Sequence, residues 1–169
     1  TSSTDTHLVK TITKYWDGME WADQTKRTFS YNSENLCERM VDFVAGNHWL
    51  ESSREIYSYD SQARLIETTI QKNDPTRYWI NYQKDYFSYD STHKIIKKIV
   101  QRWREGNWQN YWKYIYQYNS TGHLEKINEY RSGNNFPWYA WHEIKYTYDA
   151  DSRLTQYHTK RSQGSLWID

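Results

Sequence analysis

The sequence is short of cysteine, proline and glycine, and it has no long apolar run. Its 169 residues include one Cys, two Pro and six Gly. A single cysteine excludes an intrachain disulfide framework and a Cys-rich metal site. Cys37 follows Leu36 where later segments have Ile66 and Ile96, so we interpret it as a buried apolar residue rather than a nucleophile. No apolar run approaches the ~18 residues of a membrane span, so no membrane partner is predicted. There is also no signal peptide, although a segment cut from a secreted precursor would look the same.

Charge of one sign and aliphatic residues are also scarce. The 22 Lys and Arg nearly balance the 21 Asp and Glu, which leaves a net charge of +1. Without a long basic block, the composition argues against a nucleic-acid partner. Leu, Ile, Val and Phe together number only 27, whereas 10 Trp and 17 Tyr are present. Because each large aromatic side chain buries roughly 150–250 Å², we predict a folded chain with an aromatic core.

The aromatic residues recur about every 29 positions. One position of the repeat holds Trp21, Trp49, Trp79, Trp108, Trp138 and Trp167. Pairs of aromatics follow eight and ten residues later at Phe29/Tyr31, Tyr57/Tyr59, Phe87/Tyr89, Tyr116/Tyr118 and Tyr146/Tyr148. Each repeat opens on an aliphatic residue, at Leu8, Leu36, Leu65, Ile95, Leu124 and Leu154. The chain is therefore predicted to be a single repeat domain, 1–169, with repeats at about 8–35, 36–64, 65–94, 95–123, 124–153 and an incomplete 154–169.

Each repeat has the pattern of a β-hairpin. A first strand, such as 36–44 or 95–103, precedes a turn rich in Gly, Asn, Asp or Pro. These turns fall at Asp17 and Gly18, Gly46 and Asn47, Asp74 and Pro75, Gly106 and Asn107, and Gly133, Asn134 and Asn135. A second strand of about eleven residues then runs from the Trp to the last Tyr. No 3.6-residue apolar period is present. The predicted fold is all-β, an antiparallel meander of roughly eleven strands in tandem hairpins, strongly twisted or solenoid-like.

Each second strand ends in a polar turn headed by Asn32, Asp60, Asp90, Asn119 or Asp149. These side chains could attract calcium, but the spacing of a calcium loop is missing, so capping of an Asx turn explains them better. The chain stops just inside a second strand, at Leu166, Trp167, Ile168 and Asp169. Repeat arrays normally end in an atypical cap, so we expect the chain to be attached to further domains in a longer protein.

The segment Tyr118-Asn119-Ser120-Thr121-Gly122-His123-Leu124 resembles the YD (RHS-type) repeat, which has Tyr-Asp, a short turn with Gly, and then Leu. Similar segments begin at Tyr59, Tyr89 and Tyr148, so the resemblance covers the whole chain. The added Gly-x-x-Trp hairpin looks like repeats of secreted bacterial surface proteins. The family implies an extracellular, all-β shell of hairpins, associated with carbohydrate binding or toxin encapsulation. It supplies no catalytic residues that could be carried over.

Strict alternation along the second strand would separate two faces. One face would hold the Trp and the aromatics eight and ten residues later, which recur in each full repeat and are best explained by packing. The other face would carry Tyr82, Tyr111 and Trp141 three residues after the Trp, and Lys84 and Lys113 five residues after it. Equivalent residues of neighbouring second strands would lie about 9.5 Å apart, twice the interstrand spacing. That distance is comparable to a disaccharide in an extended polysaccharide.

Aromatic faces stack on sugar rings, and cations bind carboxylates or sulfates. The rings of this face could equally pack against a second layer or a neighbouring domain. Arg102, Trp103, Arg104, Trp108 and Trp112 form the densest cationic and aromatic cluster, which could be a structural cation–π cluster or a binding edge. The candidate ligand-binding residues are Tyr82, Lys84, Arg102, Trp103, Arg104, Trp108, Tyr111, Trp112, Lys113, Tyr139 and Trp141.

Catalysis has little support in the sequence. The six His are scattered, and neither His-x-x-x-His nor Gly-x-Ser-x-Gly occurs. His142 and Glu143 are adjacent on a predicted strand and therefore point to opposite faces. We predict no enzyme, no catalytic residue, no cofactor and no metal.

The sequence thus favours a secreted, non-catalytic carbohydrate-binding module for an extended, possibly anionic polysaccharide. A structural or adhesive YD-type repeat segment of a larger secreted protein is the alternative. A polysaccharide-degrading enzyme, whose carboxylate pair could hide among many solvated ones, is a third class.

Overall fold

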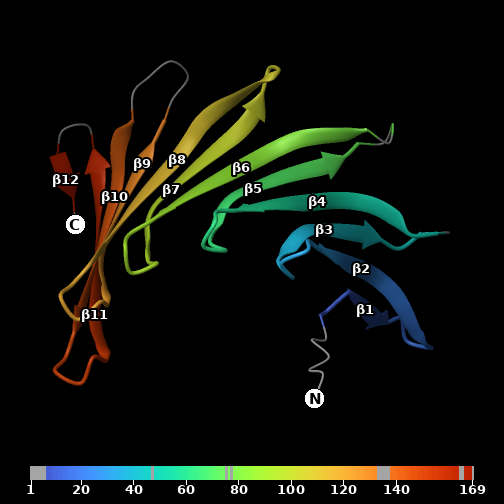
Figure 1. The fold of residues 1–169 in the computed structure, drawn as a ribbon, viewed down its shortest axis with the longest axis horizontal. Coiled ribbons are helices and arrows are strands. Elements are labelled where there is room, and N and C mark those ends of the chain that lie inside the picture. Colours follow the sequence, from blue (N-terminus) through green and yellow to red (C-terminus); the bar gives the residue numbers. More distant parts are fainter. Residues whose placement is uncertain are drawn as a thin grey trace. The chain divides into compact units, whose positions relative to one another are not determined.

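The structure is a computed structural model that describes residues 7–46, 48–74, 76, 78–132, 138–163 and 166–168. All of its regular structure is β-strand (Figure 1). The strands are β1 (Lys10–Trp16), β2 (Trp21–Tyr31), β3 (Cys37–Val44), β4 (Leu50–Tyr59), β5 (Leu65–Asn73), β6 (Trp79–Tyr89), β7 (Ile95–Arg104), β8 (Asn107–Tyr118), β9 (Leu124–Arg131), β10 (Tyr139–Tyr148), β11 (Leu154–Gln163) and β12 (Leu166–Ile168). The predicted strand pairs of each repeat are confirmed, and three residues near the end of the chain add a short twelfth strand.

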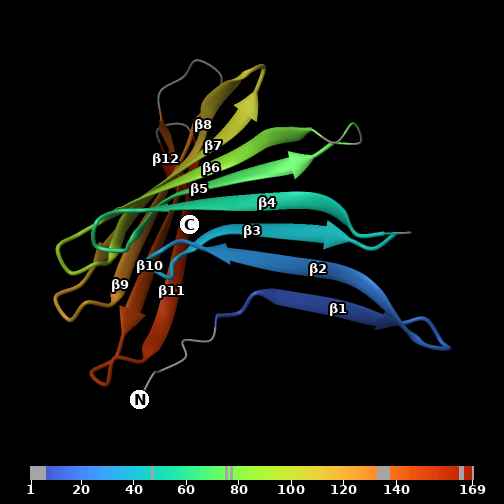
Figure 2. The ribbon, with the colours of Figure 1, turned by 45° about the vertical axis from the view of Figure 1, so that its right-hand side comes forward.

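The strands form one sheet in the order of the sequence, from β1 to β12. Each described pair of neighbours is antiparallel, as β3 and β4 are, so the predicted antiparallel meander is confirmed. The chain divides within β6 into two compact units, an N-terminal unit of residues 1–83 and a C-terminal unit of residues 84–169. Figure 2 shows β1 to β4 of the N-terminal unit side by side. Strands β7 to β11 belong to the C-terminal unit.

The polar turns between repeats are closed by the Asn or Asp side chain that begins them. In the turn after β6, Asp90 Oδ1 accepts hydrogen bonds from the backbone N–H of Thr92 at 2.8 Å and of Lys94 at 3.0 Å. Asn119 Oδ1 accepts the equivalent two bonds after β8. The interpretation of these residues as Asx-turn caps is confirmed. One residue of each turn has a positive φ, and only the turn after β8 places a glycine there, Gly122.

The last tyrosine of the second strand is bonded back to the start of its own repeat. The phenol of Tyr118 donates to the carbonyl of Ile95 at 2.9 Å, and the phenol of Tyr148 donates to the carbonyl of Leu124 at 2.9 Å. Tyr31 and Tyr59 make the same bond in the N-terminal unit. This recurring bond explains why the position holds Tyr rather than Phe, and it supports the packing role inferred for the aromatic pair.

The described side chains do not enclose a conventional core. None is fully buried, and the buried apolar residues are Met40, Val41 and Val100, on first strands. Most of the aromatic rings are instead half-buried. A single sheet covers a ring only from the side of the strands and leaves its other side exposed. Tyr116 is among the better covered rings, and burial raises the pKa of its phenol to about 12. The predicted aromatic core is therefore a set of half-buried rings on the faces of a single sheet.

Three of the predicted turns fall partly or wholly outside the described residues, at Asn47, at Pro75 and at 133–135.

Candidate functional site

The second strands β2, β4, β8 and β10 contain a β-bulge at the position three residues after the repeated Trp. In β8, Asn110 pairs with Gln101 and Trp112 pairs with Val100, so Tyr111 is the extra residue. The same shift makes Gln24, Ser52 and Trp141 the extra residues of β2, β4 and β10. A bulge adds one residue to one strand of a pair and so reverses the alternation of side chains beyond it. The bulge therefore decides which side chains share a face.

Strict alternation predicted that the repeated Trp and the aromatics eight and ten residues later share one face, and the bulge makes this prediction wrong. Trp108 lies opposite Trp103, whereas beyond the bulge Trp112 lies opposite Val100. Opposed residues share a face, so the repeated Trp and the later tyrosines of β8 lie on opposite sides of the sheet. We call the side with Trp103, Trp108 and Lys113 the tryptophan face. The arginine face is the side of β7 to β11 with Arg102, Tyr111, Arg131, Trp141 and Arg161.

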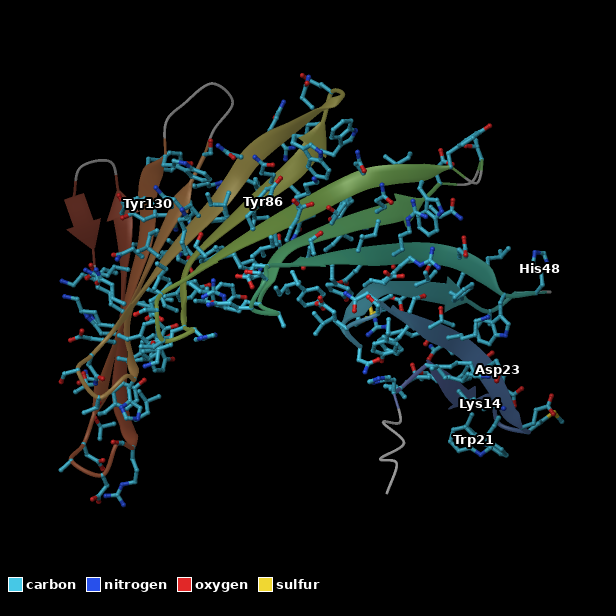
Figure 3. All side chains as sticks on the ribbon, viewed as in Figure 1. Lys14, Trp21, Asp23, His48, Tyr86 and Tyr130 are labelled. Atoms are coloured by element: carbon cyan, nitrogen blue, oxygen red, sulfur yellow. The ribbon has the colours of Figure 1, made fainter. Side chains whose placement is uncertain are left out.

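On the tryptophan face, cations pack over the repeated Trp. Lys113 Nζ lies 4.1 Å from the ring centroid of Tyr130, labelled in Figure 3, and 5.2 Å from that of Trp138. Lys84 Nζ lies 5.3 Å from the Trp108 centroid. The N-terminal unit repeats the contact between Lys26 and Trp49, at 5.0 Å, and between Arg54 and Trp79, at 4.3 Å. Burial lowers the pKa of Lys113. Lys84 and Lys113 therefore pack on the repeated Trp. Strict alternation had placed them beside Tyr111 on the same face, and that prediction is wrong.

On the arginine face, three guanidinium groups surround the ring of Tyr111. The Cζ atoms of Arg102, Arg104 and Arg131 lie 5.4, 5.8 and 5.9 Å from its centroid. Arg131 is central because it lies opposite Trp112 on β8 and opposite Tyr139 on β10. Its guanidinium is also 5.2 Å from the ring of Trp141. Planar cations and aromatic rings at these distances attract one another, so the cluster holds its own shape.

The aromatic rings of this face touch one another as well. The Trp112 ring lies 5.7 Å from Tyr111 and 6.1 Å from Trp141, and Tyr139 lies 6.4 Å from Trp141. The bulge residue Tyr111 is anchored through its backbone, whose carbonyl accepts a bond from the N–H of Ser132 at 3.2 Å. The arginine face therefore carries a group of touching aromatic rings with arginines among them.

A depression of about 390 Å³ opens at this cluster. Its lining consists of Arg102, Arg104, Gln109, Asn110, Tyr111, Arg131, Ser132 and Tyr139. Small-ligand sites have volumes of about 300–1,000 Å³. The volume of the depression lies in the lower part of this range. Its polar groups are guanidinium, amide and hydroxyl groups, which together can bind anionic groups and hydroxyls.

The candidate residues separate into four groups in the structure. Four of them line the depression: Arg102, Arg104, Tyr111 and Tyr139. Trp112 and Trp141 adjoin it on the arginine face. On the tryptophan face lie Lys84, Trp103, Trp108 and Lys113. Tyr82 belongs to the N-terminal unit, where it is 38% exposed and has Lys72 Nζ 3.9 Å from its ring centroid. The predicted proximity of Trp103 and Trp108 is confirmed, with centroids 5.1 Å apart.

Sequence reasoning missed Gln109, Asn110, Arg131 and Ser132. For Arg131 a signal was present. It stands seven residues after the opening Leu124, as Arg102 stands seven after Ile95 and Arg161 seven after Leu154. The recurrence of arginine at one position of three repeats could have identified the row.

His142 and Glu143 do point to opposite faces. His142 Nδ1 lies 3.1 Å from a carboxylate oxygen of Glu129 on the arginine face, whereas Glu143 bonds to Lys126, 2.5 Å away, on the other. Chiefly through that bond to Lys126, the pKa of Glu143 is lowered. Within the described ranges, no three side chains of His, Cys, Asp or Glu are grouped as metal ligands would be. The same residues contain no helix of the length and hydropathy that a membrane span requires.

The sequence matches no protein-family model and no curated protein. Among solved structures, a protein of unknown function from Bacteroides fragilis aligns with a TM-score of 0.59 at 13% identity, covering 71% of this chain and 90% of its own. A DUF3836 family protein from Parabacteroides distasonis aligns with a TM-score of 0.42 at 18% identity, over 50% and 84%. The TcdB2-TccC3-Cdc42 structure aligns with a TM-score of 0.39 at 13% identity, over 90% of this chain and 8% of its own. The first likeness shows a shared all-β fold, and the other two carry no further argument.

Proposed function

We propose that this protein is a non-catalytic carbohydrate-binding module that holds an extended polysaccharide on the arginine face of its C-terminal unit. The supporting observation is the depression in which Arg102, Arg104 and Arg131 surround Tyr111. Aromatic rings supply flat apolar surface for sugar rings, and the arginines supply donors to their oxygens. The YD-type pattern at the turns adds support for an extracellular setting and for attachment to further domains of a secreted protein.

The alternative is a structural or adhesive repeat segment, and specific contacts favour it too. The tryptophan face and the tyrosine hydroxyls show that many aromatic residues of this chain serve strand packing. In that case the rings of the arginine face would contribute only to stability.

Tyr111→Ala separates the two functions. We expect the variant to fold, by circular dichroism, and to lose retardation in affinity gels that contain the polysaccharide bound by the parent chain. The expected loss is about tenfold in affinity, equivalent to about 1.4 kcal/mol. Tyr78→Ala is the matched control, because Tyr78 is 74% exposed, belongs to the N-terminal unit and does not line the depression.

Gels with neutral, uronic and sulfated polysaccharides provide the panel for this test. Failure of all of them to retard the parent chain would contradict carbohydrate binding. Release of reducing ends during incubation would indicate an enzyme instead.

A further inference from the structure

A row of cations runs across the arginine face at one position of the repeat. Seven residues after the opening aliphatic, the last three repeats carry Arg102, Arg131 and Arg161. The first two repeats have Tyr15 and Phe43 there, and the third has Lys72, whose Nζ lies 3.9 Å from the ring centroid of Tyr82. Their three strands, β7, β9 and β11, alternate in the sheet with β8 and β10. A cation therefore stands at this position from the third repeat onward, and arginine only in the last three repeats.

Aromatic bulge residues fill the places between these arginines. The ring centroid of Tyr111 lies 5.4 Å from the guanidinium of Arg102 and 5.9 Å from that of Arg131. The centroid of Trp141 lies 5.2 Å from Arg131 and 4.6 Å from Arg161. The order across five strands is thus cation, ring, cation, ring, cation. An arginine that contacts a ring can still donate N–H groups to an anion, because its guanidinium carries five N–H donors.

Three arginines of this face have no acidic partner among the residues that the structure describes. In the described part of the chain, Arg104, Arg131 and Arg161 contact aromatic rings but have no carboxylate at ion-pair distance. Elsewhere in the same unit lysines are neutralised, as Lys98 is by Asp85 at 2.9 Å and Lys126 by Glu143. The nearby Glu129 is bonded to His142. A ligand with negative charge therefore fits the arginine face better than a neutral one.

The spacing of the row narrows the ligand further. Arg131 is level with Val100 on β7, and Arg161 is level with Glu129 on β9, so the row crosses the sheet diagonally. Each step of the row is about 9.5 Å across the sheet and about 7 Å along the strands. We propose that the arginine face binds a polysaccharide that lies across β7 to β11 and carries an acidic group once per disaccharide. This inference rests on the proposed carbohydrate-binding function and specifies its ligand. A uronic carboxylate and a sulfate share the required chemistry, since both accept paired bonds from arginine.

Isothermal titration of the full chain with size-defined hyaluronan, which has one carboxylate per disaccharide, tests the proposal. Carboxyl-reduced hyaluronan is the neutral match, and desulfated and sulfated chondroitin distinguish carboxylate from sulfate. We expect hyaluronan or chondroitin sulfate to bind at least about tenfold more tightly than the reduced polymer, because the charge-assisted bonds are lost with the carboxylate. Equal binding of reduced and native polymers would overturn the acidic-group assignment.

Arg131→Gln removes the central cation, and Lys145→Gln is its control. Lys145 lies on the opposite face of the same unit with a side chain 54% exposed, and its partner Glu143 keeps Lys126. We expect about tenfold weaker binding for the first variant and a change within about twofold for the second. Should Arg131→Gln fail to fold, Arg104→Gln, which alters an exposed residue at the end of β7, replaces it.

The outcomes separate the two proposals. Binding of neutral polysaccharides that is sensitive to Tyr111→Ala but not to Arg131→Gln would retain the carbohydrate-binding module and refute its acidic ligand. Equally tight binding of polyglutamate or single-stranded DNA would refute recognition of a sugar and indicate a general polyanion surface.

Discussion

The hydroxyl of Tyr118 offers a measurable test of how the repeats are held together. Tyr118→Phe deletes only the bond to the Ile95 carbonyl, at 2.9 Å, and keeps the ring. A hydrogen bond of this kind contributes about 0.5–1.5 kcal/mol to stability. Since Tyr118 is only half-buried, water can reach part of the freed carbonyl, and we expect the loss to be about 0.5–1 kcal/mol.

The effect should be visible in equilibrium unfolding. For a chain of this length, a loss of 1 kcal/mol lowers Tm by about 2–4 °C. Urea unfolding of Tyr118→Phe should show a lower midpoint with an unchanged slope. Tyr157→Phe is the control, because the hydroxyl of this exposed residue makes no bond within the described part of the chain.

A double variant strengthens the test. Tyr148→Phe removes the equivalent bond to Leu124 in the next repeat. The two losses should add within about 0.5 kcal/mol, because the sites share no partner. If Tyr118→Phe and Tyr157→Phe had the same stability, the recurring hydroxyl bond would not hold the repeats together and this reasoning would be refuted.

Two further predictions concern a turn and the tryptophan face. The pKa of Asp90 is lowered by bonds from the Thr92 hydroxyl and the backbone N–H of Lys94. The ionised carboxylate of Asp90 therefore stabilises the turn fully at neutral pH. This stabilisation is lost as the pH falls below about 4 and passes through the lowered pKa. Asp90→Asn should keep the cap, as Asn119 does, and should reduce the fall of Tm between pH 4 and 2; an unchanged fall would contradict the assignment. Lys113→Met should keep the packing on Trp138 but lose the cation–π attraction, at a cost of about 0.5–1 kcal/mol in urea unfolding, whereas unaltered stability would show that the ring contact contributes nothing.

The sequence was sufficient for the repeats, their hairpins and the ends of the strands. Aromatic and aliphatic residues at fixed spacing mark where each strand begins and ends, and turn residues such as Asp90 cap through local bonds that depend on nearby residues alone. These features are local, so a single sequence contains them. The strands with clearest patterns, such as β7 and β8, lie where they were expected.

The composition of each face was not predictable in the same way. The bulge at Tyr111 has no marker such as glycine, and it reverses the alternation beyond it. As a result Lys113 was assigned to the face of Tyr111, although it packs on Trp138 across the sheet. Arg131 was missed because its neighbours, Trp112 and Tyr139, come from two other strands and are opposed only through the strand register.

Arginine modification with phenylglyoxal, read by mass spectrometry with and without an acidic polysaccharide, tests the binding surface most directly. We expect hyaluronan or chondroitin sulfate to protect Arg104 and Arg131. Arg153, whose side chain is 73% exposed and bonded to Asp149 in a turn, should react equally in both conditions. Protection of Arg153 to the same degree, or no protection of Arg104 and Arg131 by any acidic polysaccharide, would contradict binding on the arginine face.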